Sequence, residues 1–494
     1  MQYKLENLID LESRESNSPA ILKKDLVYTY HDLDNLSSSF AQTIATGIKE
    51  NKYVGIYLEN SPAFIISVLA LWKLGAVPVP VNLLAADGEL INLINIAGIS
   101  AIITEELYSQ RLLSVIKQSK RKIKIIIYWT DQEKGETGKT RVEVKNQSTK
   151  KEAVVIFTSG ASGEPKGVVH TFHSLLSSIV NGNEVLDHKN GDRWLASLPF
   201  YHIGGFQIIC RAIYYSAAII IPQSLQTDHI SKAIKEYKPT HASFVSTQLK
   251  RLLENNVKPN DDLRCSLIGG GFMEKKLLID AKKSGWHPVK VYGSSETASF
   301  VCALNENDIE LKGDSAGIPI GNNRIYIVDE NGEEFSIQTA GELVIKSDSL
   351  FKNYLNNESE TKDKLKQDSY FTGDLGYIDV DGFLFVTGRK NEMIVTGGKN
   401  VNPIEVETAI LKYLGIVEAV VFPIDDIEWG EIVCAALVTS VKIDTRNLRT
   451  FLKKELSSYK VPKKIFVEVA LPRTLLGKIE RLKLKKKYNP RRNH

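Results

Sequence analysis

The amino-acid sequence predicts an α/β protein with more than one domain, on two observations. Over the first 150 residues, apolar strand-like runs alternate with helical stretches such as residues 61–74, which is typical of a parallel sheet covered by helices. The strand-like runs are residues 53–58, 76–81, 100–104 and 123–129. The chain has 494 residues, more than a single hydrophobic core usually organises.

The composition is that of an ordinary globular protein, with 43% hydrophobic and 25% charged residues. The longest apolar stretch, near residues 203–221, is interrupted by Gln207 and Arg211, so we expect no integral membrane segment. The N-terminus lacks the basic start and apolar core of a signal peptide, and we therefore expect a cytoplasmic protein. The cysteines are far apart and form no metal-type pair, so we expect buried, reduced thiols at Cys210, Cys265, Cys302 and Cys434.

Positive charge gathers at the C-terminal end, although the formal net charge is only +4. The cluster consists of Arg481, Lys483, Lys485, Lys486, Lys487, Arg491 and Arg492. No helix-turn-helix, zinc-finger or RNA-binding motif accompanies it. We therefore expect a solvated tail and no nucleic-acid partner.

A glycine- and hydroxyl-rich loop lies between two apolar runs within residues 153–170, in the order strand, loop, strand. Its glycines permit close approach of the backbone, its hydroxyls can donate hydrogen bonds, and its lysine adds a mobile cation, so the loop suits a polyphosphate. These residues are Thr158, Ser159, Gly160, Ser162, Gly163, Lys166 and Gly167. The loop is not a Walker A motif, because glycine and not serine or threonine follows Lys166. A surface hairpin is the alternative.

The pattern Thr-Ser-Gly-x-Ser-Gly-x-Pro-Lys-Gly resembles the phosphate loop of the adenylate-forming superfamily, which comprises acyl-CoA synthetases, luciferases and peptide-synthetase adenylation domains. Ala161 departs from that pattern, which usually has threonine there. Together with this loop, seven motifs in the superfamily's order cover roughly residues 28–481. The resemblance implies a large N-terminal lobe of two α/β subdomains and a β-barrel-like subdomain, residues 1–390, and a small mobile C-terminal α+β domain, residues 391–494.

Two turns further along the chain resemble the rest of that superfamily's nucleotide site. Residues 267–272 end a strand in three glycines, as a backbone must when a flat ring packs on it. Residues 291–300 resemble the Tyr-Gly-x-Thr-Glu motif, in which Ser295 keeps the usual hydroxyl; the alternative is a plain turn with a solvated glutamate. The candidates for ATP are Gly270, Gly271, Tyr292, Gly293 and Ser295. Glu296 and Thr158 are the candidates for Mg²⁺, and Glu296 is also a catalytic candidate.

His202 and Arg211 are the candidates for an acid pocket. His202 lies on a proline-bounded loop ahead of a long apolar helix, and a packed core histidine is the alternative. Arg211 lies inside that helix, where a buried guanidinium needs an anionic or carbonyl partner from either the protein or a substrate. The resemblance implies that this motif borders the acyl pocket together with Gly270 and Ser299, and that His202 takes part in catalysis.

The last third of the chain carries candidates for the ribose, the hinge and the thiol. Asp374 and Arg389 match the superfamily's ribose-binding residues, and Asn391 stands at the pivot, where aspartate or lysine is usual. The residues that match the pantetheine-facing loop are Gly397, Gly398 and Lys399. The Pro-x-Thr-x-x-Gly-Lys spacing near the end implies that Lys478 is the catalytic, ATP-binding lysine of the closing motif.

The resemblance implies an ATP-dependent acid-CoA ligase that works through an acyl-adenylate, with ATP, Mg²⁺ and CoA. Glu296, the loop hydroxyls and Lys478 would neutralise charge while a carboxylate attacks the α-phosphorus. The compact length, the His202 motif and Arg211 most resemble the o-succinylbenzoate-CoA ligases of menaquinone biosynthesis. The alternatives are a fatty-acid or aryl-acid CoA ligase, an enzyme that loads a carrier protein, and a nucleotide-binding pseudoenzyme.

Overall fold

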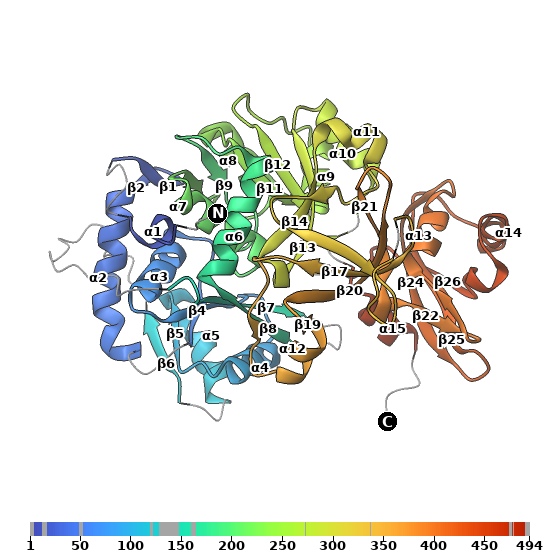
Figure 1. Ribbon diagram of the computed structural model, residues 1–494, viewed down its shortest axis with the longest axis horizontal. Coiled ribbons are helices and arrows are strands. Elements are labelled where there is room, and N and C mark those ends of the chain that lie inside the picture. Colours follow the sequence, from blue (N-terminus) through green and yellow to red (C-terminus); the bar gives the residue numbers. More distant parts are fainter. Residues whose placement is uncertain are drawn as a thin grey trace. The chain divides into compact units, whose positions relative to one another are not determined.

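The computed structural model separates into two compact units (Figure 1). It describes residues 4–11, 17–48, 53–118, 122–127, 148–159, 165–271, 273–335, 337–473, 477 and 479–489. The large unit comprises Met1–Arg324 and Ile345–Tyr370, and the small unit comprises Ile325–Val344 and Phe371–His494. The segments 325–344 and 371–390 thus cluster with the C-terminal part of the chain, while the domain boundary at Asn391 stays a prediction.

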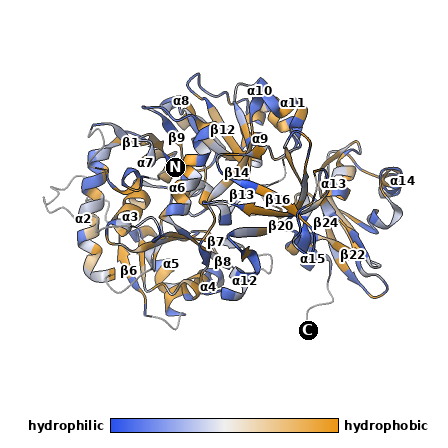
Figure 2. Ribbon diagram, in the orientation of Figure 1, coloured by the Kyte–Doolittle hydropathy of each residue, from blue (hydrophilic) through white to orange (hydrophobic). Residues whose placement is uncertain are grey.

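A nine-stranded sheet forms the centre of the large unit, in the order β15-β14-β13-β12-β11-β9-β10-β1-β2. Neighbouring strands in the run β13-β12-β11-β9-β10-β1 pair in parallel. At the two edges of the sheet, β2 pairs antiparallel with β1, β14 with β13, and β15 with β14. Their bounds are β1 Pro19–Lys23, β2 Leu26–Thr29, β9 Arg193–Leu195, β10 Ala218–Ile220, β11 His241–Val245, β12 Cys265–Gly269, β13 Pro288–Ser294, β14 Ser299–Leu304 and β15 Ile318–Pro319. The inner parallel strands β10, β11 and β12 are almost wholly buried, as expected of strands with helices on both faces (Figure 2).

Helices cover both faces of this sheet. On one face, α6 (Phe172–Leu186) and α7 (Ile203–Tyr214) pack against each other and on β14, in one core with α2 (Tyr30–Ile48) and α3 (Pro62–Lys73). The contacts of α9 (Ser246–Glu254) and α10 (Lys275–Lys283) are with β11, β12 and β13, and α8 (Thr227–Tyr237) packs on α9. The large unit is therefore a layered α/β structure, as the sequence predicts.

Two smaller sheets complete the large unit. The first is wholly parallel, in the order β4-β3-β5-β6, and its strands confirm the four predicted runs: β3 Tyr53–Tyr57, β4 Val77–Pro80, β5 Ala101–Thr104 and β6 Lys124–Ile127. It carries α4 (Asp87–Ala97) and α5 (Glu106–Lys117). The second, β18-β8-β7, contains β7 Glu152–Ser159, β8 Pro165–Thr171 and β18 Asn353–Tyr354. Its antiparallel β7 and β8 confirm the two predicted strands, while residues 160–164 of the predicted loop lie outside the described residues.

The small unit contains most of one five-stranded sheet and all of another. The first has the order β16-β17-β20-β19, with β21 paired to β20, and lies where the sequence predicts a β-barrel-like subdomain. Its strands are β16 Arg324–Val328, β17 Gly341–Lys346, β19 Leu365–Lys366, β20 Ser369–Ile378 and β21 Leu384–Arg389.

The second sheet of the small unit has the order β23-β22-β25-β24, with β26 paired to β25. Its strands are β22 Ile394–Thr396, β23 Lys399–Val401, β24 Ile416–Asp426, β25 Gly430–Thr439 and β26 Lys464–Val467. Helices α13 (Pro403–Leu411) and α14 (Thr445–Glu455) pack on it and give the predicted α+β domain.

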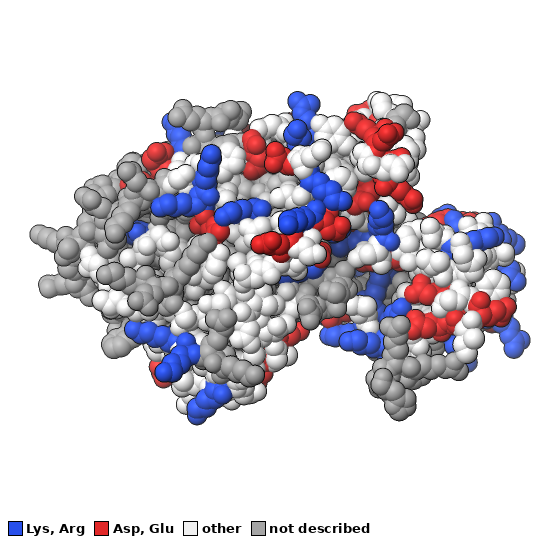
Figure 3. Space-filling view, turned by 60° about the horizontal axis from the view of Figure 1, so that its bottom comes forward, with Lys and Arg blue, Asp and Glu red and all other residues white. Residues whose placement is uncertain are grey.

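The prediction of a solvated C-terminal tail is confirmed only in part: Lys483, Lys486 and Lys487 are exposed, but the backbone of residues 481–488 forms helix α15 (Arg481–Tyr488). Leu484 is 1% exposed, and its helix packs on β24. Most of the helix's cations pair with carboxylates of the same unit: Arg481 with Glu407, Lys485 with Glu431 at 3.3 Å, and Lys487 with Glu468 at 2.6 Å. On the face in Figure 3, basic and acidic side chains are likewise interspersed.

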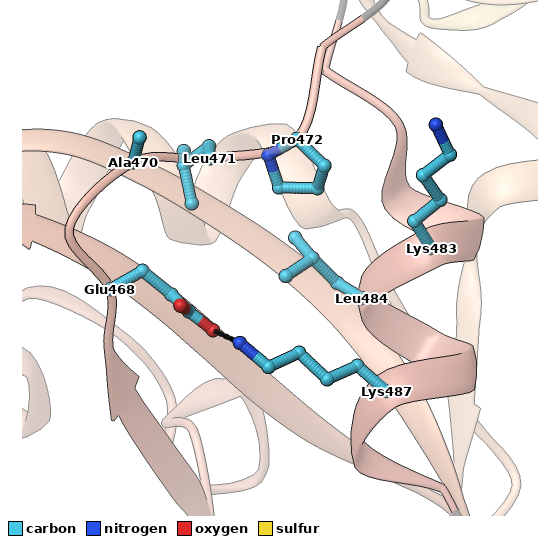
Figure 4. A pocket seen from close by; sticks show the side chains of 7 residues that line it. All are labelled: Glu468, Ala470, Leu471, Pro472, Lys483, Leu484 and Lys487. Atoms are coloured by element: carbon cyan, nitrogen blue, oxygen red, sulfur yellow. Dashed lines mark hydrogen bonds and ion pairs between the residues drawn. The ribbon is translucent and has the colours of Figure 1, made fainter.

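A groove of about 400 Å³ lies between α15 and the segment that precedes it (Figure 4). Leu471, Pro472 and Leu484 make its apolar lining, and the Glu468–Lys487 ion pair crosses one side. The groove thus belongs to the packing of α15, whose charges the unit itself neutralises.

Two further expectations can be compared with the described residues. None of the described helices combines the length and the apolar character that crossing a membrane requires. All four cysteines are buried and unpaired, as predicted, and burial raises the pKa of Cys265 to about 12.

Candidate functional site

Several candidate site residues of the large unit follow the carboxyl ends of the parallel strands of its central sheet. His202 follows β9, Gly270 and Gly271 follow β12, and Ser295 and Glu296 follow β13. In open α/β sheets, ligands bind in the crevice outside these strand ends. The sheet thus brings together residues that are up to 94 positions apart, from His202 to Glu296.

Tyr354 connects the phosphate-loop hairpin to Glu296. Its hydroxyl donates to Glu296 Oε1 at 2.8 Å, and Lys166 Nζ lies 5.5 Å from the centre of its ring. Lys166, which pairs with Thr158 across β7 and β8, also forms an ion pair with Glu360. Burial and the nearby carboxylate of Glu296 raise the pKa of Tyr354, so it remains a donor. The structure therefore gathers the predicted cation and the predicted metal ligand around one phenol.

His170 fixes the turn that carries Ser295 and Glu296. Its Nε2 lies 2.7 Å from the carbonyl oxygen of Ser295, and its Nδ1 lies 3.0 Å from Ser174 Oγ. Burial lowers the pKa of His170 to about 4, so the ring is neutral near pH 7 and its Nε2 carries the proton that the carbonyl accepts. No sequence motif identified this residue, although it lies near the end of β8, the strand that follows the phosphate loop.

Glycine is required at position 293, where β13 turns toward β14. A Cβ there would lie 1.8 Å from the carbonyl oxygen of Ser299 and 2.6 Å from the Cα of Phe300. The turn itself carries two consecutive residues with positive φ, Ala298 at 51° and Ser299 at 110°. Positive φ is unusual for residues with a Cβ and is found preferentially at functional sites.

We expect Gly293→Ala to lower the free energy of unfolding by about 1–3 kcal/mol, because the backbone of β14 must shift to admit the methyl group. Binding of a non-hydrolysable ATP analogue, measured by calorimetry, should weaken as well. Gly88→Ala in α4 is the matched control, since a Cβ there meets nothing within 4 Å, and alanine favours a helix. Equal stability and affinity of the two variants would contradict the steric argument.

Arg211 is buried without a hydrogen-bonding partner for two of its nitrogen atoms. The side chain is 1% exposed, Nε and Nη2 lack a hydrogen bond, and the guanidinium carbon lies 4.9 Å from the centre of the Phe300 ring. Burial lowers the pKa of Arg211 to about 10, so it remains a cation at neutral pH. An aromatic face compensates only part of the lost hydration of a guanidinium.

His202 caps the start of α7, four residues before Phe206, whose N–H donates to the His202 carbonyl at 2.8 Å. Its ring lies 4.5 Å from that of Tyr201. Burial lowers the pKa of His202 to about 4. At neutral pH the ring therefore carries no charge and can interact with an acid only through a hydrogen bond.

In the small unit, the predicted ribose residues are neighbours. Asp374 and Arg389 face each other across β20 and β21, with 2.7 Å between Arg389 Nε and Asp374 Oδ1. Asp374 is 7% exposed, and its N–H donates to Thr372 Oγ1 at 2.9 Å. The arginine thus orients a nearly buried carboxylate.

Asn391 lies between two side chains that are anchored on different elements. It is exposed in a 3₁₀ turn, Lys390–Glu392. Lys390 Nζ lies 3.1 Å from Glu342 of β17, and Glu392 lies 3.3 Å from Nε of Arg481 at the start of α15. The residues on either side of the predicted pivot are therefore fixed to different parts of the unit.

Gly397 and Gly398 form the two-residue turn between β22 and β23, with φ values of 55° and 73°. Positive φ at both positions is the requirement of a tight hairpin turn. A Cβ on Gly397 would lie 2.6 Å from the ring of Trp429, and the Gly397 N–H donates to the Trp429 carbonyl at 2.9 Å. The glycine turn is thus packed against an indole.

An aromatic and basic surface surrounds this turn, and the sequence analysis identified only Lys399 in it. Trp429 is 40% exposed, and Lys463 Nζ lies 3.8 Å from the centre of its ring. Lys399 Nζ lies 4.7 Å from the centre of the Tyr459 ring, and Lys460 pairs with Glu405 at 2.6 Å. The exposed indole of Trp429 beside Lys463 suits a ligand with a flat ring and phosphate groups, whereas the ring of Tyr459 is partly buried.

Several candidates lie outside the described residues: Gly160, Ser162, Gly163 and Lys478, and also Ala161. Of Ser159, only the backbone is described, as the last residue of β7. Among the described residues there is no cluster of three histidine, cysteine or acidic side chains that could hold a metal. One carboxylate and one hydroxyl, from Glu296 and Thr158, still fit Mg²⁺, which usually takes one or two carboxylates and completes its shell with phosphates and water.

Comparison with known families identifies the chain. A model of the AMP-binding enzymes matches residues 11–355, and a model of the AMP-binding enzyme C-terminal domain matches residues 405–478. The chain belongs to the AMP-binding enzyme family. The resemblance to the adenylate-forming superfamily is thereby confirmed, and so is the expected fold.

Individual members of the family are similar over two thirds of the chain or more. The 2-succinylbenzoate–CoA ligase of Bacillus pumilus strain SAFR-032 is 31% identical over 95% of each chain, and that of Bacillus licheniformis is 37% identical over 67% of this chain and 69% of its own. The structure of o-succinylbenzoate CoA synthetase from Bacillus subtilis with the acyl-adenylate OSB-AMP has a TM-score of 0.88 at 28% identity, over 98% of this chain and 99% of the other. The same enzyme with ATP and magnesium has a TM-score of 0.85 at 27% identity, over 97% and 99%.

Proposed function

We propose that this AMP-binding enzyme is an acid-CoA ligase that converts 2-succinylbenzoate, ATP and CoA into 2-succinylbenzoyl-CoA, AMP and pyrophosphate through an acyl-adenylate. Family membership and the named activities of similar enzymes support the reaction class. ATP and CoA are cytoplasmic metabolites, so we place the enzyme in the cytoplasm, in menaquinone biosynthesis.

The unpaired guanidinium of Arg211 is the observation that carries the choice of acid. Leaving a buried cation without a partner costs several kcal/mol, whereas a substrate carboxylate would compensate it. 2-Succinylbenzoate has one carboxylate to activate and a second on its ring. A fatty acid offers only the carboxylate that reacts, and it would leave Arg211 unpaired.

Each candidate in the large unit has a role in adenylation. Thr158, Ser159, Gly160, Ser162, Gly163 and Lys166 bind the phosphates; Gly270, Gly271, Tyr292, Gly293 and Ser295 bind the adenosine and the α-phosphate. Glu296 and Thr158 hold Mg²⁺, which when bound neutralises phosphate charge. His202, Arg211, Gly270 and Ser299 line the acid pocket, where neutral His202 donates a hydrogen bond to the acid. His170 and Tyr354 position Ser295 and Glu296.

The small unit provides the ribose carboxylate, the catalytic lysine and the thiol surface. Asp374, oriented by Arg389, accepts hydrogen bonds from the ribose hydroxyls. Lys478 stabilises the charge that develops as pyrophosphate leaves. Gly397, Gly398 and Lys399 face the pantetheine arm after a rotation about Asn391, and Trp429 and Lys463 bind the nucleotide end of CoA.

We expect Trp429→Ala to raise the KM for CoA by about tenfold, because stacking of a base on an aromatic side chain contributes about 1–3 kcal/mol. Acyl-adenylate formation, measured as pyrophosphate release without CoA, should stay within a factor of two. Ile427→Ala is the matched control, since Ile427 is in the same turn, is 92% exposed and has no aromatic ring on which a base could stack. A proportional loss in both half-reactions would argue against a CoA surface.

The test of the proposed function is a panel of acids assayed for ATP-dependent AMP release with and without CoA. Turnover that requires 2-succinylbenzoate and CoA would support the proposal. Turnover with fatty or aryl acids alone would identify another CoA ligase, and turnover only with a carrier protein would replace CoA as the acceptor. No AMP release with any acid would contradict the assignment as a ligase.

A further inference from the structure

Gln207 and Arg211 lie one turn apart on the buried face of α7. Their exposed fractions are 0% and 1%. Side chains four residues apart are neighbours on a helix, with about 5–6 Å between their Cβ atoms. Both contact the start of β14: Gln207 donates to the carbonyl of Ala298 at 3.0 Å, and Arg211 lies over the ring of Phe300. Ser299, a candidate for the acid pocket, is the residue between those two contacts.

The hydrogen bonds of Gln207 determine which way its amide points. Its Nε2 faces two carbonyl oxygens, of Ala298 at 3.0 Å and of Leu175 at 3.5 Å. The reversed amide would place its oxygen against both carbonyls, which would repel it. The oxygen Oε1 therefore points away from them, and it has no hydrogen-bond partner. A buried amide oxygen in that position is costly unless a ligand or a bound water donates to it.

The surroundings of Arg211 leave its charge uncompensated. The titratable groups that interact electrostatically with it are Cys210, Tyr215, Cys265 and His188. None of these is a carboxylate, and burial raises the pKa of both thiols well above neutrality. One turn of α7 thus holds a buried cation with unused donors beside a buried amide with an unused acceptor. A carboxylate bound to the cation, with a water bridging it to the amide oxygen, would use both.

We infer that Gln207 is a specificity-determining residue with two roles. Because its side chain is neutral, it leaves the guanidinium of Arg211 available to bind the second carboxylate of the acid. Its amide oxygen binds the water that bridges to that carboxylate. The inference rests on the proposed function. It has a chemical consequence: the residue one turn before Arg211 must be neutral. An acidic side chain there would pair with Arg211 and repel a dicarboxylic acid, while an acid with a single carboxylate would be little affected.

The experiment compares two acids, 2-succinylbenzoate and the analogue in which hydrogen replaces the ring carboxylate. The ratio of their kcat/KM values, measured as AMP release with CoA, defines the preference for a dicarboxylic acid. We expect Gln207→Glu to lower this preference by about 100-fold or more, because an unpaired buried charge is replaced by an internal ion pair. Gln207→Met, which is neutral and of similar length, should lower it about three- to tenfold through loss of the bridging acceptor. The loss of the Nε2 hydrogen bonds to Ala298 and Leu175 in the same variant should affect both acids alike and leave the ratio unchanged.

The outcomes separate this inference from the proposed function. A wild-type enzyme that does not use 2-succinylbenzoate would contradict the proposed function itself. If the wild type uses it but Gln207→Glu keeps the preference within threefold, or loses activity equally with both acids, Gln207 acts only on the fold and the inference is wrong. If Gln207→Glu does not fold, as judged by thermal unfolding, Gln207→Met decides, since an unchanged preference in that variant would also overturn it.

Discussion

Replacing Lys478 by alanine is expected to slow acyl-adenylate formation by about 100-fold or more, equivalent to about 3 kcal/mol in the transition state. The carboxylate and the phosphate are both anionic, and negative charge moves onto pyrophosphate as it leaves, so a positioned cation contributes most at that moment. The half-reaction is measured as pyrophosphate release by the purified variant. Thioester formation from chemically prepared acyl-adenylate should be largely unaffected, because that step needs no such cation.

Lys483→Ala is the matched control for Lys478→Ala. Lys483 lies five residues further along the same basic segment, 64% of its side chain is exposed, and it pairs with Glu480 at 2.7 Å. Loss of a surface ion pair of this kind costs at most about 1 kcal/mol. Near-normal adenylation by Lys478→Ala, or an equal loss in both variants, would refute the catalytic role.

Replacing Asn391 by proline is expected to slow thioester formation by about tenfold or more while largely sparing adenylation. Proline fixes φ near −65° and restricts the preceding residue, so it hinders the backbone change that a pivot must make. Lys390 forms an ion pair with Glu342, and Glu392 forms one with Arg481. Because both neighbours of Asn391 are held in this way, we expect the change in backbone angles to occur mainly at Asn391.

Single-turnover measurements of the two half-reactions test the Asn391→Pro prediction. Asn391→Ala is the control, because it removes the side chain and leaves the backbone free to rotate. Both half-reactions of that variant should stay close to the wild type. An equal loss of adenylation and thioester formation in Asn391→Pro would argue against a pivot at this residue.

The strands and the order of the site residues could be predicted because both depend on local sequence. Runs such as residues 53–58 and 100–104 are short, apolar and rich in β-branched residues, and the structure confirms them as β3 and β5. The motif spacing likewise identified Glu296 and Lys166 as candidates for one site. Such predictions use only the pattern of neighbouring residues, so they do not require knowledge of which distant segments contact each other.

The contacts that support the site could not be predicted, because they join distant segments. Tyr354 reaches Glu296 across 58 positions and His170 reaches Ser295 across 125, through pairing of strands that no local pattern specifies. Helix α15 was missed for the same reason. Its run of lysines gives no indication of a packed helix when considered alone, and the carboxylates that pair with Lys485 and Lys487, Glu431 and Glu468, come from other parts of the small unit.

The position of β1 in the central sheet has a consequence for synthesis on the ribosome. Ile21 of β1 pairs with Ile219 of β10, and the hydroxyl of Tyr30 donates to the carbonyl of Ala217 at 2.8 Å. Because translation adds about 5–20 residues per second, β10 is synthesised roughly 10–40 seconds after β1, and β1 cannot pair with it before then. A chain shortened by its first 29 residues would complete translation with β10 at the rim of the sheet. Its unpaired backbone groups would then favour aggregation of the newly made protein.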